Sequence, residues 1–218
     1  MALTVEAARV KGWGDQSSHL STRRVEEKPV KALVVFESMF GNTEAVARAV
    51  ATGLAETVEV EVREVSQEPS PTNGTVDLIV VGGPTHAFSM SRPSTRAQAR
   101  EQGATHGEPD VGLREWLADL GRRPHSEMVA AFDTRVARAR RLPGSAAKKA
   151  EKVVHALGYS VVGRMSFWVE DSPGPLLPGE LERAAAWGRE LADDLAGRAV
   201  AASTVHAPAT RGRRGLHL

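Results

Sequence analysis

The sequence predicts an α/β protein with a five-stranded parallel sheet in the order 2-1-3-4-5 and helices on both faces, a three-layer sandwich. Between residues 30 and 197, short apolar runs alternate with longer helical segments, which is typical of βα units. The second run, VEVEVREV (58–65), alternates apolar and charged residues, whereas its neighbours are continuously apolar. An alternating strand exposes one face and therefore belongs at an edge, where this order places the second strand.

The expected elements follow in order along the chain. Strands are expected at 30–37, 58–65, 76–83, 128–133 and 159–169. Helices are expected at 42–55, 111–120, 144–158 and 178–197. Continuous hydrophobicity indicates that the first and third strands are buried on both faces. Gly121, Gly158 and Gly197 follow the last three helices and are expected to stop them.

Composition divides the chain into one domain and two tails. Residues 1–29 are polar without a sustained period and are expected to be a flexible extension; 30–197 form the α/β domain. Residues 198–218 carry four arginines and no acidic residue, and are expected to be a basic, flexible tail. Because these arginines lack interleaved aromatics, we expect a solvated tail and no nucleic-acid contact.

The composition also narrows location and chemistry. No apolar run is long enough for a membrane span and the N-terminus lacks the pattern of a signal peptide, so we expect a cytoplasmic protein with no membrane partner. The 218 residues include no cysteine, which excludes disulfides, thiolate metal sites and cysteine nucleophiles. The seven histidines show no metal-ligand spacing, so no metal is assigned. Redox chemistry would therefore require a bound organic cofactor.

A small polar loop, ESMFGNT (37–43), joins the first strand to its helix. A helix N-terminus offers unpaired N–H groups and a partial positive charge, which suit a phosphate. Ser38 and Thr43 add hydroxyls, Gly41 allows a positive φ, and Asn42 can cap the helix. The loop has no basic side chain and no Gly-Lys-Ser/Thr ending, which disfavours a P-loop and a magnesium nucleotide.

The whole run around this loop resembles the flavodoxin family. The residues that fall at the family's spacing are Phe36, Ser38, Gly41, Thr43, Ala47 and Val50. SMFGNT also looks like the phosphate loops of flavodiiron proteins and of flavodoxin-like quinone reductases. The resemblance covers 30–197 and implies a flavodoxin-like fold with a flavin mononucleotide (FMN) site. The residues it implies around the 5′-phosphate are Ser38, Met39, Phe40, Gly41, Asn42 and Thr43.

The resemblance also points to the loops after the third and fourth strands. It implies that the first of these contacts the ribityl chain and one face of the flavin ring, through Pro84, Thr85, His86, Ala87 and Phe88. In the second loop Asp133 and Thr134 are candidates for the pyrimidine edge of the ring. Arg135 is a candidate for stabilising negative charge there, which would raise the reduction potential. Asp133 and Arg135 have the alternative of a surface ion pair, and His86 that of a solvent-facing loop histidine.

The segment from 87 to 110 is long and lacks an apolar period, so we expect a loop that covers the flavin, binds a nicotinamide cofactor's phosphates or forms a partner surface, with a flexible loop as the alternative. Arg92, Arg96, Arg100 and His106 lie in it. Arg138, Arg140 and Arg141 are expected to form a solvated basic rim that steers an anionic substrate or partner.

Three functions remain open from the sequence. The first is an FMN-binding redox protein that passes electrons to a partner protein, with the chemistry supplied by the flavin and no catalytic side chain. The second is an NAD(P)H-dependent FMN quinone reductase, an oxidoreductase. The third is a non-redox binding module that has lost the flavin, which the lack of a Tyr or Trp at the ring-facing loop motivates. The oligomeric state is not indicated.

Overall fold

The computed structural model of the chain describes residues 29–67, 76–122 and 125–205. The expected N-terminal extension up to residue 28 and the tail from residue 206 lie outside the described residues. The described ranges contain six strands: β1 (Lys31–Phe36), β2 (Glu59–Glu64), β3 (Leu78–His86), β4 (Ser89–Met90), β5 (Met128–Val136) and β6 (Ser160–Val169). The helices are α1 (Asn42–Leu54), α2 (Pro93–Glu101), α3 (Leu113–Ala118), the short 3-10 helix η1 (Ala137–Ala139), α4 (Ala146–Leu157) and α5 (Glu180–Val205).

The sheet has the predicted topology. Its parallel strands run in the order β2-β1-β3-β5-β6, and β4 pairs antiparallel with the end of β3. Counted along the chain without β4, this is the order 2-1-3-4-5. The alternating strand β2 lies at the edge, where its residues are exposed and half-buried in turn. The pattern of one strand therefore identified the edge of the sheet correctly.

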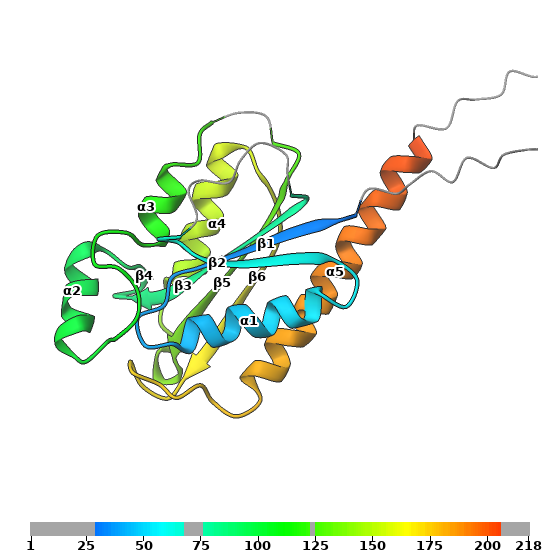
Figure 1. Cartoon of the computed structure of the whole chain (residues 1–218). Helices are drawn as coiled ribbons and strands as arrows, with labels where there is room; N and C mark the ends of the chain where they lie inside the picture. Colours follow the sequence, from blue (N-terminus) through cyan, green and yellow to red (C-terminus); the bar gives the residue numbers. More distant parts are fainter. Residues whose placement is uncertain (1–28, 68–75, 123–124, 206–218) are drawn as a thin grey trace, which may run out of the picture.

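The two faces of the sheet carry separate cores. Figure 1 shows α1 and α5 on one face and α3 and α4 on the other. Successive side chains of a strand point to opposite faces. In β1, Val34 packs in the core beneath α1 and α5, whereas Leu33 and Val35 pack in the core beneath α3 and α4. The same alternation in β3 and β5 explains why these strands are continuously apolar.

The strands β3 and β5 extend past the ends expected at Gly83 and Asp133. They reach His86 and Val136 because the two strands keep pairing, with Gly83 opposite Asp133. The stretches expected as the second and third loops therefore begin as strand. Gly82 is needed in this pairing, since a Cβ there would lie 2.0 Å from the ring of Phe132.

The loop expected at 87–110 is only partly irregular, because it contains β4 and α2. The buried residues of α2 are Arg96 and Ala99, so the helix has no apolar stripe that a periodicity search would detect. The last helix also differs, because α5 continues through Gly197 to Val205. An exposed glycine destabilises a helix by only about 1 kcal/mol relative to alanine. The many alanines of α5 favour the helix enough for it to continue through this position.

The helix α5 is 26 residues long and projects beyond the sheet (Figure 1). In the part of the chain that the structure describes, neither α5 nor any other helix combines the length and apolar character needed to cross a membrane.

The helices α1 and α5 meet through two glycines. A Cβ on Gly53 of α1 would lie 2.0 Å from the carbonyl oxygen of Ala185, and one on Gly188 of α5 would lie 2.2 Å from that of Val50. Each helix thus places a bare backbone position against the backbone of the other. This close approach packs α5 directly against α1, and the N-terminus of α1 lies at the carboxyl end of β1.

We expect Gly188→Ala to lower the free energy of unfolding by about 1–3 kcal/mol, because the added methyl forces the helices apart. Gly197→Ala is the matched control in the same helix. A Cβ there meets no atom within 4 Å, so the higher helix propensity of alanine should raise stability by up to about 1 kcal/mol. Urea denaturation followed by circular dichroism measures both; equal effects at the two sites would contradict the proposed contact.

Candidate functional site

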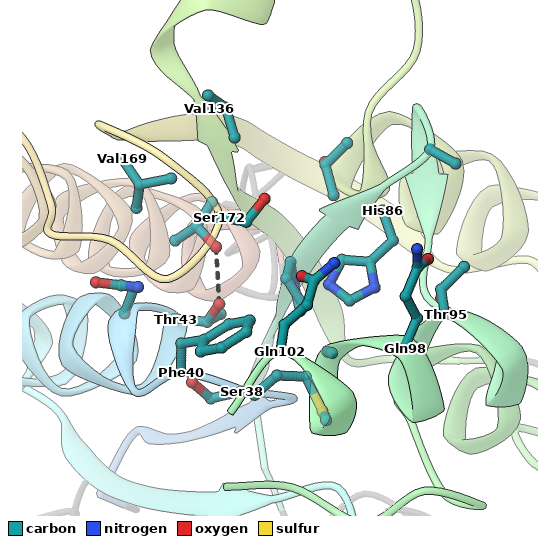
Figure 2. Close-up of a pocket in the computed structure, with 17 residues that line it drawn as sticks. Ser38, Phe40, Thr43, His86, Thr95, Gln98, Gln102, Val136, Val169 and Ser172 are labelled. Carbon is teal, nitrogen blue, oxygen red and sulfur yellow. Dashed lines mark hydrogen bonds between the residues drawn. The ribbon is translucent and has the colours of Figure 1, made fainter. Parts of the chain in front are cut away.

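A cavity of about 230 Å³ opens at the carboxyl ends of β1, β3 and β5, between the start of α1 and one face of α2 (Figure 2). This is the position where ligands bind in sheets of this topology. Among the residues that the structure describes, no Asp, Glu, Lys or Arg side chain lines it. Elsewhere in the described ranges no group of three His, Asp or Glu side chains is placed to hold a metal ion. The lining residues are Ser38, Met39, Phe40, Asn42, Thr43, Pro84, Thr85, His86, Ala87, Thr95, Gln98, Ala99, Gln102, Thr134, Val136, Val169 and Ser172.

The loop before α1 forms one end of the cavity. Gly41 has a φ of 84°, a conformation that favours glycine, and its N–H donates to the Ser38 hydroxyl at 3.1 Å. As N-cap it provides no side-chain acceptor for the first N–H groups of α1. The helix therefore begins with uncapped donors and the positive end of its dipole, an arrangement that suits an anion. The one acid of the first turn, Glu44, is bound to Arg48 at 2.8 Å.

Two contacts fix the polar side chains of this loop. The hydroxyls of Thr43 and Thr134 lie 2.8 Å apart, which joins the start of α1 to the end of β5 (Figure 2, dashed line). The Asn42 amide donates to the carbonyl oxygen of Pro173 at 3.0 Å, so the loop after β6 is tied to the same place. Three distant segments thus converge at the start of α1.

The segment after α2 supports the loop from outside. Ala99 and Ala104 pack against the buried Met39 side chain. The His106 N–H donates to the Met39 carbonyl oxygen at 3.2 Å. A Cβ on Gly107 would lie 2.8 Å from the Ser38 carbonyl oxygen, so this segment follows the loop backbone closely. The segment from 87 to 110 thus lines the cavity through α2 and also holds the loop that forms the polar end of the cavity.

A buried charge fixes α2. Arg96 is fully buried and donates to the Pro109 carbonyl oxygen at 2.7 Å and to the Ser91 hydroxyl at 2.8 Å. Its guanidinium also lies 3.0 Å from a carboxylate oxygen of Glu115. Because these contacts occupy it inside the protein, Arg96 is not available to bind the phosphates of a nicotinamide cofactor. Arg100, by contrast, is exposed, and its guanidinium donates to the carbonyl oxygens of Ala104 and Gly107.

Glu37 ends β1 beside this arginine. Its side chain is buried, and its Oε2 accepts a hydrogen bond from the Leu113 N–H at 2.8 Å. Burial raises the pKa of Glu37 above its ordinary value, and the nearby Ser91 hydroxyl and Arg96 charge offset only part of that rise. Gly112 allows the two groups to approach, since a Cβ there would lie 2.3 Å from an Arg96 nitrogen.

His86 forms the wall opposite the start of α1. Its ring points into the cavity beside the side chains of Gln98 and Gln102 (Figure 2). Burial lowers the pKa of His86, and the positive charge of Arg96 lowers it further. The imidazole is therefore neutral at pH 7. The alternative of a solvent-facing loop histidine does not agree with this placement.

Asp133 faces away from the cavity. The carboxylate is fully buried and accepts hydrogen bonds from the Thr85 hydroxyl at 2.8 Å and from the Ala147 N–H at 3.1 Å. Thr85 in turn accepts from the Ala146 N–H at 2.8 Å. Asp133 and Thr85 thus satisfy the first donors of α4, which explains a charged side chain at the end of a buried strand.

Arg135 also turns away from the cavity. It donates to the carbonyl oxygens of Ala139 and Leu142, at 3.2 and 3.1 Å, and lies 5.4 Å from the centre of the Trp168 ring. Its contacts are therefore with backbone oxygens and an indole. The alternative of an ion pair with Asp133 is not formed, and Arg135 does not line the cavity.

The turn between β3 and β4 has an unfavourable backbone. Ala87 and Phe88 are its two central residues, with φ angles of 45° and 62°. Two-residue hairpin turns of this kind normally use Asn, Asp or Gly, because other residues are strained there. Phe88 is nevertheless 53% exposed, so its side chain is displayed outward at the rim of the cavity.

The structure brings most of the predicted site residues to one cavity and leaves four outside its lining: Gly41, Phe88, Asp133 and Arg135. The largest set that the sequence did not predict comes from one face of α2: Thr95, Gln98, Ala99 and Gln102. Their spacing of three and four residues would have identified that face, had a helix been expected there. Val136, Val169 and Ser172 complete the unpredicted lining.

Comparison with solved structures reveals clear similarity at low sequence identity. The chain is similar to a short-chain flavodoxin associated with a bacterial microcompartment (TM-score 0.55, 17% identity, 76% of this chain and 99% of that one). It is similar to a flavodoxin from the domain Archaea (TM-score 0.50, 19%, 77% and 99%) and to one from Streptococcus pneumoniae TIGR4 (TM-score 0.50, 18%, 76% and 99%). No family model and no curated protein matches the sequence. The fold is therefore flavodoxin-like.

We expect the pKa of His86, measured by NMR on the ring protons, to lie below the ordinary value of about 6.5. Because the unfolded chain binds a proton more readily, His86 contributes stability above pH 6.5 that is lost as the pH falls through the lowered pKa. His86→Gln should therefore reduce the loss of stability between pH 7 and pH 5. A measured pKa at or above 6.5 would contradict the burial of the ring.

We expect Ala87→Asn to raise the free energy of unfolding by about 0.5–1 kcal/mol, because asparagine tolerates a positive φ. Ala97→Asn is the matched control at an exposed position within α2. It should lower stability by a few tenths of a kcal/mol through helix propensity. Urea denaturation measures both, and a loss at residue 87 as large as that at residue 97 would argue against backbone strain in the turn.

Proposed function

We propose that this chain is an FMN-binding redox protein that exchanges electrons with a partner through a non-covalently bound flavin. The observation that carries the proposal is the polar end of the cavity. There the start of α1 offers uncapped N–H groups beside the Ser38 and Thr43 hydroxyls, with no charged side chain in the lining. The topological position and the flavodoxin-like fold support it.

The residues present fit the phosphate of FMN by their donor chemistry. Backbone N–H groups and hydroxyls bind an anion through dipoles, and the positive φ of Gly41 curves the loop toward them. Ser38, Asn42 and Thr43 would hold the phosphate. Pro84 to Ala87 and Thr134 line the cavity beyond that end, and Phe40 offers an aromatic ring. Gly41 would contribute through the conformation of its backbone. Phe88, Asp133 and Arg135 would influence the bound flavin only from outside the cavity lining.

FMN, when bound, supplies the capacity to accept and donate electrons; the chain's own residues hold it and set its surroundings. Among the described residues the lining has no Lys or Arg, and the lowered pKa of His86 keeps its imidazole neutral, so no charged side chain in the lining stabilises the negative charge that reduction adds. We therefore infer a low reduction potential. This reverses the expectation based on Arg135, whose guanidinium is engaged elsewhere.

A specific observation favours a second candidate, a non-redox binding module. The cavity of about 230 Å³ is smaller than the roughly 300–1,000 Å³ typical of small-molecule sites, and Phe40 is its one Phe, Tyr or Trp ring. FMN would then have to lie partly outside it. For the alternative of an NAD(P)H-dependent quinone reductase, Arg96 is bound within the protein, whereas Arg92 and Arg100 are exposed.

We expect the purified full chain to bind FMN at least about tenfold more tightly than riboflavin, because only FMN engages the start of α1. Flavin fluorescence and absorption titrations measure both affinities. Ser38→Ala should weaken FMN binding and leave riboflavin binding unchanged. Ser160→Ala, at an exposed position at the opposite end of the sheet, is the matched control and should change neither.

Two outcomes would decide against the proposal. If neither flavin binds, the non-redox candidate is favoured. If both bind equally and Ser38→Ala has no effect, the start of α1 is not a phosphate site, and the carrying observation fails.

A further inference from the structure

We propose that the rim of the cavity is a docking surface for an acidic partner protein. We define the cationic rim as residues 87–88 and 138–142, which include Phe88, Leu142 and three arginines. The identification of that partner as the protein that exchanges electrons with the flavin rests on the proposed function; the docking itself does not.

The cationic rim has an apolar centre. Phe88 is 53% exposed and Leu142 is 48% exposed, the two highest values among the large hydrophobic residues that the structure describes. The two segments are neighbours at Gly144, two residues after Leu142, since a Cβ on Gly144 would lie 2.5 Å from the Phe88 carbonyl oxygen. The turn that displays Phe88 is strained, and strain that serves no interior packing is typical of functional sites.

Arginines surround this centre. The side chain of Arg138 is 75% exposed, and Arg141 is exposed at the same short segment. Arg140 lies over the Trp168 ring at 4.7 Å, which holds its charge in place. The nearby acids are the exposed Asp171, which pairs with Arg138 at 3.0 Å, and its neighbour Glu170. The arginines outnumber them, so the cationic rim attracts negative charge.

The segment that carries these arginines is held from below. The buried guanidinium of Arg135 donates to the carbonyl oxygens of Ala139 and Leu142. It therefore fixes the backbone between the exposed arginines before any partner arrives. A surface fixed in advance loses less conformational entropy on binding than a mobile one. This gives Arg135 a role outside the cavity, as a positioning residue for the cationic rim.

The cationic rim borders the opening of the cavity on both sides. Ala87, which precedes Phe88, lies in the lining. Val136, which precedes the arginine segment, also lies in the lining (Figure 2). Ser172, also in the lining, follows Asp171. A protein seated on Phe88 and Leu142 would therefore cover the opening.

The composition favours an acidic protein over other occupants. An exposed aromatic and an aliphatic side chain surrounded by arginines is typical of protein interfaces. A second copy of the same surface would place arginines against arginines, which is repulsive. We therefore expect charge complementarity with a carboxylate-rich face, fast association, and binding that weakens as salt is added.

The test uses the full chain, labelled with ¹⁵N, and a plant-type ferredoxin as an acidic electron-transfer protein. We expect amide resonances of 87–88 and 138–142 to shift on titration, and the affinity to fall about tenfold or more between 50 and 300 mM NaCl. Cytochrome c, a basic protein, should not shift these resonances. The titration is made with and without FMN, so that it reports on docking even if the flavin proposal fails.

Two variants test the charges. Arg138→Glu should weaken ferredoxin binding about tenfold or more and reduce its salt dependence. Arg189→Glu is the matched control, because Arg189 is an exposed arginine paired with an exposed glutamate, Glu56, at 3.1 Å, on the helix α5. Arg189→Glu breaks a comparable exposed ion pair and changes the net charge by the same amount as Arg138→Glu, and it should leave ferredoxin binding unchanged. Phe88→Ser should weaken binding without changing its salt dependence.

The proposal is overturned if ferredoxin shifts no resonance of the cationic rim, if cytochrome c binds there equally well, or if the two Arg→Glu variants weaken binding to the same extent. Tighter binding of an oligonucleotide than of ferredoxin at 87–88 and 138–142 would also overturn it, in favour of a nucleic-acid surface. Loss of FMN binding with docking retained would refute the proposed function and leave the docking surface in place.

Discussion

The burial of one positive charge determines the shape of the candidate site. A guanidinium that is fully removed from water must be paired and hydrogen-bonded, or the protein is destabilised by several kcal/mol. Arg96 meets this requirement through three groups. These are the Ser91 hydroxyl directly after β4, the Pro109 carbonyl oxygen in the loop between α2 and α3, and the Glu115 carboxylate in α3. One side chain therefore fixes α2 against three segments, with Glu37 at the end of β1 beside it.

The position of α2 then determines both ends of the cavity. One face of the helix provides the wall formed by Gln98 and Gln102, next to a histidine that burial keeps neutral. The chain that leaves α2 packs against Met39 and follows the backbone of the loop before α1. The charged group that organises the site is thus kept out of its lining, while the lining itself has neutral polar and apolar side chains. Dipoles remain as the means of attracting an anion.

The sequence predicted the sheet well, because continuous and alternating hydrophobicity record how each strand is buried. VEVEVREV identified the edge, and Gly158 ends α4 with a φ of 99° as expected. The helix α2 escaped prediction because its buried residues are an arginine and an alanine, whose burial depends on partners distant in sequence. The placement of Asp133 and Arg135 depended equally on tertiary contacts, with the start of α4 and the backbone around Leu142. The residue types suggested flavin contacts for both Asp133 and Arg135, but residue type alone does not indicate which way a side chain points.

The two glycines between α1 and α5 have a consequence for how the molecule transmits force. Side chains at a helix interface can change rotamer and absorb a small displacement, whereas backbone pressed on backbone has no such freedom. At Gly53 and Gly188 the contact involves backbone carbonyl oxygens on both helices. We therefore expect α1 and α5 to move as one rigid unit. A displacement of the projecting end of α5 would then also displace the first turn of α1, which lies beside the cavity.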